Sequence, residues 1–242
     1  MWTKREICSF IDLTSLNSYD SPTSIRAFIQ QAIDYDKQGF SVAAVCVFPN
    51  FAPLVIDLLQ ESSIKVAVVA GNFPNSQGFL TTKIHECGLV LDAGVDEVDI
   101  VLNLGAFDEG DYEQVVSEVR AFKGIMPNQT LKVILETGYL KTPERIQKAC
   151  ELAIAGGADF LKTSTGKEYP GACIEAAEVM AKAISGSAKK VGLKISGGVK
   201  TYEDAVKYCE AVEKHLGKNF MTPKTFRIGA SSLIKDLMRE LV

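Results

Sequence analysis

The sequence predicts one α/β domain over residues 1–242, folded as a (β/α)8 TIM barrel. Eight short apolar runs rich in Val, Ile and Phe recur along the chain, and successive runs start roughly 24 to 34 residues apart, the size of a βαβ repeat. Segments with helical periodicity separate these runs. The 242-residue length agrees with the about 250 residues typical of this fold.

The apolar runs are predicted to be parallel strands buried on both faces, because most of them are nearly continuous in apolar residues rather than alternating. In chain order the predicted strands are Ile7–Leu13, Ser41–Phe48, Lys65–Ala70, Glu97–Leu102, Leu131–Glu136, Asp159–Thr163, Val191–Ile195 and Thr225–Ile228.

The intervening segments carry apolar stripes at helical spacing, and glycines such as Gly39, Gly94 and Gly157 stand where helices should end. The clearest stripes are Ile25, Phe28, Ile29, Ala32 and Ile33; Tyr112, Val115, Val116, Val119 and Phe122; Ala205, Cys209, Val212 and Leu216; and Leu233, Ile234, Leu237, Met238 and Leu241. A doubly wound open sheet is the alternative, but it usually has fewer strands, and its Gly-x-Gly-x-x-Gly turn is absent from the sequence.

Composition argues against several functional classes. The net charge of −4 and the lack of a long Lys/Arg run disfavour nucleic-acid or membrane binding. No apolar run approaches the ~18 residues of a membrane helix. The six cysteines form no Cys-x-x-Cys and no secretory signal is evident, so we expect reduced thiols and a cytoplasmic location. Neither of the two histidines belongs to a metal-ligand pattern, so no metal is expected.

In a (β/α)8 barrel, catalytic residues lie at the carboxyl ends of the strands, whereas charges at the amino ends are usually structural. Lys65 and Lys132 open their predicted strands and are expected to be solvated. The polar or reactive residues at or near the carboxyl ends are Asp12, Cys46, Asp99, Glu136, Lys162 and Lys194.

Two lysines occupy equivalent places on neighbouring predicted strands. Lys162 stands between an apolar run and a hydroxyl-rich turn, so partial desolvation would favour its neutral, nucleophilic amine. Lys194 follows the next apolar run in the same way and would repel Lys162. Either lysine alone could be a rim residue with its ammonium group in water. The pair favours a lysine of lowered pKa that acts as a nucleophile.

Two carboxylates and one thiol are weaker candidates. Asp99 lies inside an apolar strand, where an unpaired carboxylate would be costly, so it needs a cationic partner. That role could equally be a structural ion pair. Asp12 could also be a turn or cap residue. From the residues alone, Cys46 is a small core residue, because no histidine lies near it in the sequence.

Glycine-rich turns follow the sixth, seventh and eighth predicted strands, and the loops after the seventh and eighth strands are the usual phosphate site of this fold. They are Gly166-Lys167, Gly197-Gly198 and Gly229-Ala230-Ser231-Ser232. Glycine lets backbone amides approach an anion closely. A phosphate site beside an amine nucleophile, with a second cation and a carboxylate, indicates Schiff-base chemistry on a phosphorylated carbonyl compound.

The motifs resemble those of the deoxyribose-phosphate aldolase family of class I aldolases along nearly the whole chain. The matching segments are Ile11-Asp12-Leu13-Thr14-Ser15-Leu16-Asn17, Val45-Cys46-Val47-Phe48-Pro49, Glu97-Val98-Asp99-Ile100-Val101, Phe160-Leu161-Lys162-Thr163-Ser164-Thr165-Gly166, Gly192-Leu193-Lys194 with Gly197-Gly198-Val199, and Arg227-Ile228-Gly229-Ala230-Ser231-Ser232. The Lys-Thr-Ser-Thr-Gly segment is highly specific.

The resemblance implies a (β/α)8 barrel that reversibly cleaves 2-deoxy-D-ribose 5-phosphate to glyceraldehyde 3-phosphate and acetaldehyde, without a cofactor. Lys162 would form the imine, Lys194 would perturb it, and Asp99 would join Lys194 in proton relay. The phosphate would be held by Gly166, Lys167, Gly197, Gly198, Gly229, Ser231 and Ser232. The sugar side would be lined by Asp12, Thr14, Asn17, Cys46 and Thr163. A homodimer is expected from the family only.

Two departures from the family pattern stand out. Ile195-Ser196 replaces a small pair often found after the second lysine, and the sequence ends at Val242 without the tyrosine-terminated tail of some members. We therefore do not expect tail-assisted proton transfer. Two other classes stay open: a metal-free phosphosugar isomerase, which would not need two lysines on adjacent strands, and a non-catalytic phosphosugar-binding barrel, in which Lys162 would only pair charges.

Overall fold

The computed structural model describes residues 2–239, which form a closed barrel of eight parallel strands in chain order, with β8 paired to β1. The strands are β1 (Ile11–Thr14), β2 (Ala44–Val47), β3 (Lys65–Val69), β4 (Glu97–Val101), β5 (Thr130–Ile134), β6 (Phe160–Lys162), β7 (Gly192–Ser196) and β8 (Phe226–Ala230). This confirms the predicted TIM barrel and excludes the open sheet.

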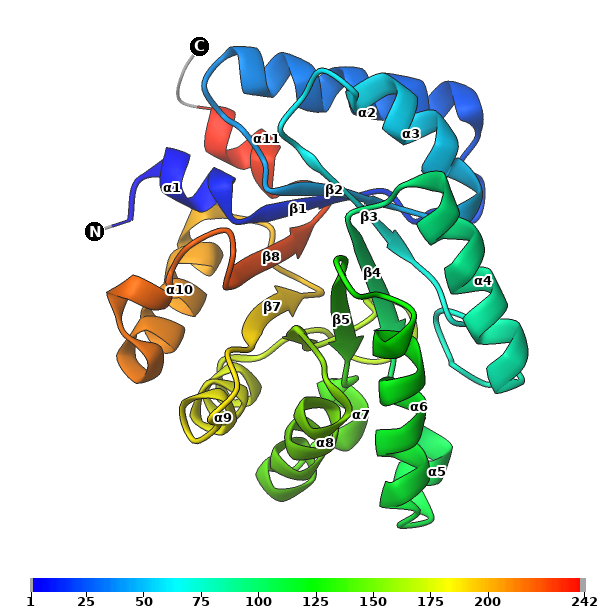
Figure 1. The fold of residues 1–242 in the computed structure, drawn as a ribbon. Coiled ribbons are helices and arrows are strands. Elements are labelled where there is room, and N and C mark those ends of the chain that lie inside the picture. The colour runs from blue at the N-terminus through cyan, green and yellow to red at the C-terminus, as the bar shows by residue number, and fades with distance from the viewer. Residues whose placement is uncertain (1, 240–242) are drawn as a thin grey trace.

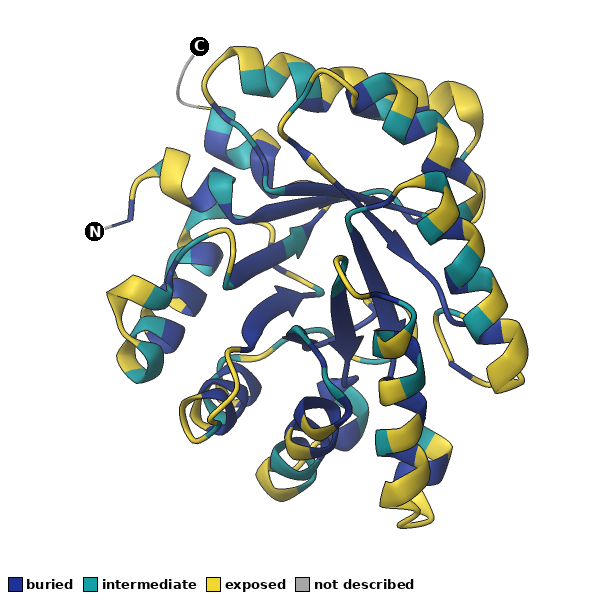
Figure 2. Cartoon of the chain, in the orientation of Figure 1, coloured by how far each residue is buried: buried dark blue, intermediate teal, exposed yellow. Residues whose placement is uncertain are grey.

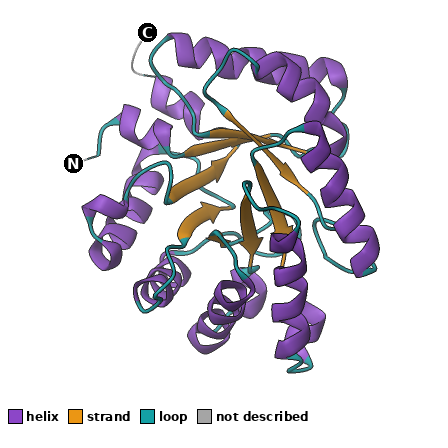
Figure 3. Cartoon of the chain, viewed as in Figure 1, coloured by secondary structure: helices purple, strands orange, loops and turns teal. Residues whose placement is uncertain are grey.

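Helices surround the strands (Figure 1). The barrel closes where the blue strand β1 lies beside the red strand β8. The helices are α1 (Lys4–Ser9), α2 (Pro22–Lys37), α3 (Ala52–Leu59), α4 (Leu80–Ala93), α5 (Leu104–Asp108), α6 (Tyr112–Gly124), α7 (Thr137–Leu140), α8 (Pro143–Gly156), α9 (Ile174–Ser185), α10 (Tyr202–Leu216) and α11 (Leu233–Met238), with 3-10 turns at Pro49–Phe51 and Lys218–Phe220. Figure 3 shows the alternation of helix and strand, to which α1, α5 and α7 are additions. Leu241 of the last predicted stripe lies outside the described residues.

The first predicted strand was wrong at its beginning. Ile7 and Cys8 belong to α1, and β1 starts only at Ile11. The helix begins because the Thr3 side chain accepts a hydrogen bond from the Glu6 amide while Glu6 accepts one from the Thr3 amide. This capping box satisfies backbone donors that would otherwise be free, and both apolar side chains are buried by the helix instead of by the sheet.

The main hydrophobic core lies between the outer face of the barrel and the helices. Strand residues such as Val45, Leu161 and Ile228 pack there with helix residues such as Ile29 and Val119. In Figure 2 most of the strand residues are buried, whereas the outward faces of the helices are exposed. Within residues 2–239, no helix combines the length and the apolar character needed to cross a bilayer.

Candidate active site

A charged side chain stands between apolar neighbours within five of the strands described, as in Ile11-Asp12-Leu13 of β1 and Leu131-Lys132-Val133 of β5, and Lys162 ends β6 after Leu161. Side chains alternate along a strand, so the charged residue and its neighbours face opposite sides of the sheet. The apolar neighbours face the helices, and the charged residues face the barrel interior. The register aligns Asp99 with Lys132, Lys162 with Lys194, and Lys194 with Arg227.

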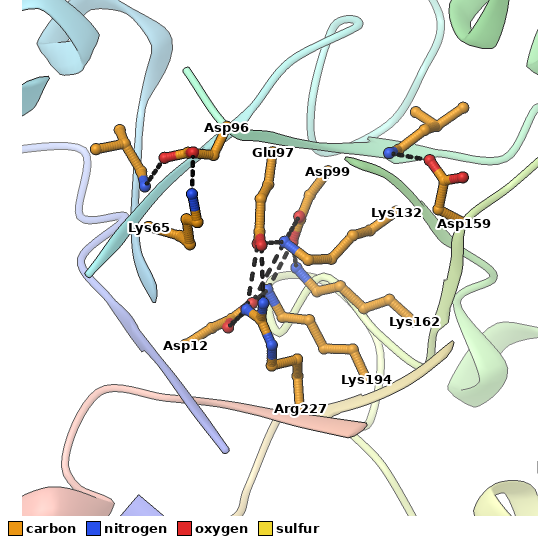
Figure 4. Close-up of polar contacts among 12 residues, drawn as sticks. Asp12, Lys65, Asp96, Glu97, Asp99, Lys132, Asp159, Lys162, Lys194 and Arg227 are labelled. Atoms are coloured by element: carbon orange, nitrogen blue, oxygen red, sulfur yellow. Dashed lines mark hydrogen bonds and ion pairs between the residues drawn. The ribbon is translucent and has the colours of Figure 1, made fainter. Parts of the chain in front are cut away.

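Asp99 lies at the centre of this interior and contacts three lysines (Figure 4). Its Oδ2 is 2.8 Å from Nζ of Lys162 and 2.8 Å from Nζ of Lys194, while its Oδ1 is 2.9 Å from Nζ of Lys132. The four side chains are 4% exposed or less. The two lysines that the sequence placed at neighbouring strand ends therefore share one carboxylate oxygen.

A second set of ion pairs continues from this centre into the barrel. Arg227 contacts Asp12 Oδ1 at 2.5 Å and Glu97 Oε1 at 2.8 Å. Lys132 contacts Glu97 at 2.5 Å, and Lys194 contacts the other oxygen of Asp12 at 2.5 Å. Asp12 is thus a fully buried member of the network rather than a turn or cap residue. Removing one partner of such a network would leave an uncompensated buried charge.

Two glycines leave room for large side chains inside the barrel, Gly229 for Lys194 and Gly192 for Phe160. A Cβ at Gly229 would lie 3.1 Å from Cε of Lys194, and one at Gly192 would lie 2.5 Å from the Phe160 ring. Any larger residue at either position would displace its neighbour inside the barrel. Gly229 was predicted to lie in a turn, but it belongs to β8, where its lack of a side chain leaves room for Lys194.

The charges set opposite protonation states for the two lysines. Burial alone would raise the pKa of Asp99, but Lys132, Lys162 and Lys194 together hold it well below its usual range. Burial opposes the charged form of Lys194, yet Asp12 and Asp99 raise the pKa of that ammonium group above its ordinary value. The pKa of Lys162 is lowered, first by burial and also by repulsion from Lys194, while the charge of Asp99 opposes this fall in part. Lys162 is therefore the amine best suited to attack a carbonyl.

A cavity of about 290 Å³ opens next to Lys162 at the carboxyl ends of β1 and β6–β8. Ten of the residues proposed from the sequence line it: Thr14, Asn17, Lys162, Gly166, Lys167, Gly197, Gly198, Gly229, Ser231 and Ser232. Six others that were not proposed as site residues also line it: Leu16, Thr165, Ser196, Val199, Lys200 and Ala230. The three glycine-rich turns thus come together at one cavity.

The turns at the cavity line it with backbone groups and with the side chains of two lysines. Gly197 and Gly198 have φ of +87° and +97°, a region that favours glycine. Lys167 donates to the Leu16 carbonyl across the cavity, so its ammonium group links the turn after β6 to the turn after β1. Lys200 supplies a second cation. These features suit an anionic group on a small ligand.

The other proposed residues lie beneath or beside the cavity. Asp12, Asp99 and Lys194 form the ion-pair network below it. Cys46 is fully buried, and burial together with the charge of Asp99 raises the pKa of its thiol.

Thr163 braces two strand ends, because its hydroxyl accepts from the Ser196 amide at 2.9 Å and donates to the Ser196 carbonyl at 3.0 Å. The Asn17 side chain, at the edge of the cavity, donates to Ser15 and Asp20 within its own turn.

Lys65 and Lys132 were expected to be solvated, and the expectation was wrong for Lys132. Lys65 is 54% exposed and pairs with Asp96, whereas Lys132 is fully buried among three carboxylates. Glu97 and Arg227 also belong to the network, although neither was predicted from the sequence to be a site residue. The recurring apolar-charged-apolar pattern would have identified Lys132 and Arg227, because it predicts an inward side chain at each such position.

Glu136 was placed at the carboxyl end of the fifth strand, and the structure puts it there, 2% exposed and bonded to Thr165. In the part of the chain that the structure describes, no group of three or more His, Cys, Asp or Glu side chains is arranged to hold a metal ion. The three interior carboxylates each contact ammonium or guanidinium groups instead.

Comparisons with known proteins bear on the chemistry of this site. The family model described as DeoC/LacD family aldolase matches residues 8–237. A deoxyribose-phosphate aldolase of Agrobacterium fabrum is 39% identical over 235 residues, covering 96% of this chain and 89% of that protein. The mouse deoxyribose-phosphate aldolase is 36% identical over 250 residues, covering 96% of this chain and 79% of that protein.

Solved structures give the same picture of the fold. A deoxyribose phosphate aldolase from Aeropyrum pernix, described as having a unique tetrameric structure, superposes with a TM-score of 0.79 at 27% identity. The match covers 99% of this chain and 94% of that one. An aldolase called QR15 gives a TM-score of 0.82 at 32% identity, covering 97% and 96% of the two chains.

Proposed function

The chain belongs to the DeoC/LacD family of aldolases, and from this premise we propose the reaction and the roles of its residues. It is a class I aldolase that reversibly cleaves 2-deoxy-D-ribose 5-phosphate to D-glyceraldehyde 3-phosphate and acetaldehyde. The observation that carries the assignment of the site is the buried Lys162, which has a lowered pKa and opens onto a cavity rimmed by glycine turns and two lysines.

Lys162 is the nucleophile in this proposal. Its neutral amine attacks the C1 aldehyde of the open-chain sugar, and loss of water with uptake of one proton from the solvent, which is returned when the imine is hydrolysed, gives a protonated imine. The imine is the electron sink, so that the C2–C3 bond can break with its electron pair delocalised as an enamine. Glyceraldehyde 3-phosphate leaves, the enamine is protonated at C2, and hydrolysis releases acetaldehyde and the free amine.

Asp99 and Lys194 serve the proton transfers. Bond cleavage requires that the C3 hydroxyl lose its proton, and the relay proposed for it comprises Asp99, Lys194 and water. Asp99 Oδ2 contacts the nitrogen atoms of both lysines, so an ionised carboxylate that can accept a proton lies next to the reacting amine. Lys194 keeps its charge because Asp12 and Asp99 raise its pKa.

The glycine-rich turns bind the phosphate at the other end of the cavity. Gly166, Lys167, Gly197, Gly198, Gly229, Ser231 and Ser232 offer backbone amides, hydroxyls and one ammonium group there. Binding energy from this remote group holds the sugar in place while the imine forms. Thr14 and Asn17 line the sugar side. Asp12, Cys46 and Thr163 support that side from below.

Reductive trapping tests the central step. Treatment with acetaldehyde and borohydride should add one ethyl group to the peptide that contains Lys162, and Lys162→Met should abolish both labelling and cleavage. Lys65→Met is the matched control, because Lys65 lies at the opposite end of the barrel and should leave labelling unchanged. Labelling of another lysine, or none with an active enzyme, would contradict the assignment. A non-catalytic binding barrel would show neither labelling nor cleavage.

We also infer a cytoplasmic location and a homodimer. The location is supported by the free state of all six cysteines, five of which are buried. The dimer is an expectation from the family. Light scattering of the purified protein and fractionation of the producing cells test the two inferences separately, and a monomer or a secreted protein would contradict them.

A further inference from the structure

Glu136 is a buried carboxylate beside the cavity for which the aldolase reaction gives no role so far. It follows β5 and precedes α7, with φ of 57° and ψ of 60°. This left-handed conformation is uncommon for a residue other than glycine, and such residues concentrate at functional sites. The side chain is 2% exposed.

The Glu136 carboxylate receives hydrogen bonds from one residue only among those the structure describes, Thr165 in the turn after β6. The Thr165 amide donates to Oε1 at 3.2 Å, and its hydroxyl donates to Oε2 at 2.5 Å. The same hydroxyl accepts a hydrogen bond from the Lys167 amide at 3.2 Å. The carboxylate therefore acts through Thr165 on the whole Thr165-Gly166-Lys167 turn.

This turn is one wall of the cavity. Thr165, Gly166 and Lys167 all line it, and Gly166 has φ of +73°, so the turn depends on its hydrogen bonds rather than on regular structure. The Lys167 ammonium group donates a hydrogen bond to the Leu16 carbonyl on the opposite side of the cavity.

Hydrogen bonds to the end of β6 fix the backbone on both sides of Glu136. The amide of Leu135 donates to the Lys162 carbonyl at 2.9 Å, and the amide of Thr137 donates to the Thr163 carbonyl at 2.9 Å. Glu136 is thus held on both sides by the β6 strand end, and only its side chain reaches the turn. Burial raises the pKa of Glu136, and the hydrogen bonds from Thr165 oppose that rise.

We propose that Glu136 is a positioning residue, whose carboxylate holds the Thr165–Lys167 turn in the conformation that binds the phosphate of the substrate. The proposal rests on the aldolase function above. It predicts a loss in phosphate affinity that exceeds any loss in the chemical step, because Glu136 acts on the turn through Thr165 and does not itself line the cavity.

The test compares Glu136→Gln with Thr165→Val, which retains the shape of Thr165 without its hydroxyl. A lost charge-assisted hydrogen bond corresponds to about tenfold in affinity. In both variants KM for deoxyribose 5-phosphate should rise about tenfold. The loss of kcat/KM should be several times larger for that substrate than for unphosphorylated deoxyribose. The double variant should be no worse than the single ones, because they break one chain of hydrogen bonds.

Three further variants separate positioning from mere stability. Glu136→Asp tolerates the left-handed backbone but is one methylene too short, so it should behave like Glu136→Gln. Thr165→Ser keeps the hydroxyl and should retain affinity. Glu144→Gln, an exposed carboxylate in α8, is the control and should change nothing. Equal losses for the two substrates, or a fall in melting temperature without a KM effect, would overturn the proposal.

Direct binding of inorganic phosphate, measured by calorimetry, makes the inference independent of catalysis. Weaker phosphate binding by Glu136→Gln or Thr165→Val supports the inference even if the native protein fails to cleave deoxyribose 5-phosphate, a result that would overturn the proposed function alone. Unchanged phosphate affinity in both variants would overturn the inference while leaving the aldolase assignment intact.

Discussion

Replacing Lys194 by methionine should shift the pH at which Lys162 becomes reactive. The Nζ atoms of both lysines lie 2.8 Å from the same oxygen of Asp99, so at most twice that distance, about 5.6 Å, separates them. At an effective dielectric constant of ~20, two unit charges at this separation repel by about 3 kcal/mol. That corresponds to roughly two pKa units.

The charges around Lys162 determine the direction in which its pKa shifts. Lys194→Met removes the repulsion and also leaves Asp12 and Asp99 with one cation fewer, and both changes favour the ammonium form of Lys162. Its pKa therefore rises. The free amine is then scarcer at pH 7, by up to about a hundredfold for a shift of two units. Raising the pH should restore it.

The assay should report imine formation alone, because Lys194 also belongs to the proposed proton relay. The initial rate of cyanoborohydride trapping with acetaldehyde, followed by mass spectrometry from pH 6 to 10, meets this condition. The profile of the variant should be displaced by about two units toward high pH, while aldolase activity should recover only in part. Lys65→Met should reproduce the native profile. A Lys194→Met profile parallel to the native one would refute the electrostatic role and leave Lys194 only its part in proton transfer.

Three further outcomes are expected. Lys132→Met should lower the free energy of unfolding in urea by about 3–5 kcal/mol, because Asp99 and Glu97 lose a buried partner; a change below about 1 kcal/mol would contradict this. Ser231→Glu places a negative charge at the anion end of the cavity, so KM for the phosphorylated substrate should rise far more than KM for unphosphorylated deoxyribose, and equal losses would mean misfolding or a mistaken site. Exhaustive chelation should leave activity unchanged, and a loss restored by a divalent cation would indicate a metal-dependent aldolase.

The barrel was predictable because its signal is repeated eight times, and a misjudged strand boundary changes little. The segment from Ile7 shows the limit of such a reading. A short apolar run fits a strand or a buried helix equally well, and only the hydrogen bonds between Thr3 and Glu6 decide for the helix. The sequence Thr-Lys-Arg-Glu carries that capping signal, but the run of apolar residues after it dominated the prediction.

The candidate site was predictable where a residue stands next to a distinctive turn, and less so where its role depends on contacts across the barrel. Lys162 and Lys194 are followed by such turns. Lys132 has no turn after it, and its side chain becomes part of the site only because β4 and β5 align it with Asp99. Glu136 reaches Thr165, 29 residues away, and no local pattern predicts that hydrogen bond.

The balance of charge inside the barrel explains why one lysine among several becomes the nucleophile. Within residues 2–239, three interior carboxylates face three cations other than Lys162: Asp12, Glu97 and Asp99 against Lys132, Lys194 and Arg227. The carboxylates raise the pKa of each of these three cations, which stay charged. A fourth positive charge would therefore be in excess in a buried space, so Lys162, at the edge of the network and next to the cavity, is the lysine whose pKa is lowered and which gives up its proton most readily. It follows that removing any one of the three cations should return Lys162 toward its ammonium form, whichever contact that cation makes.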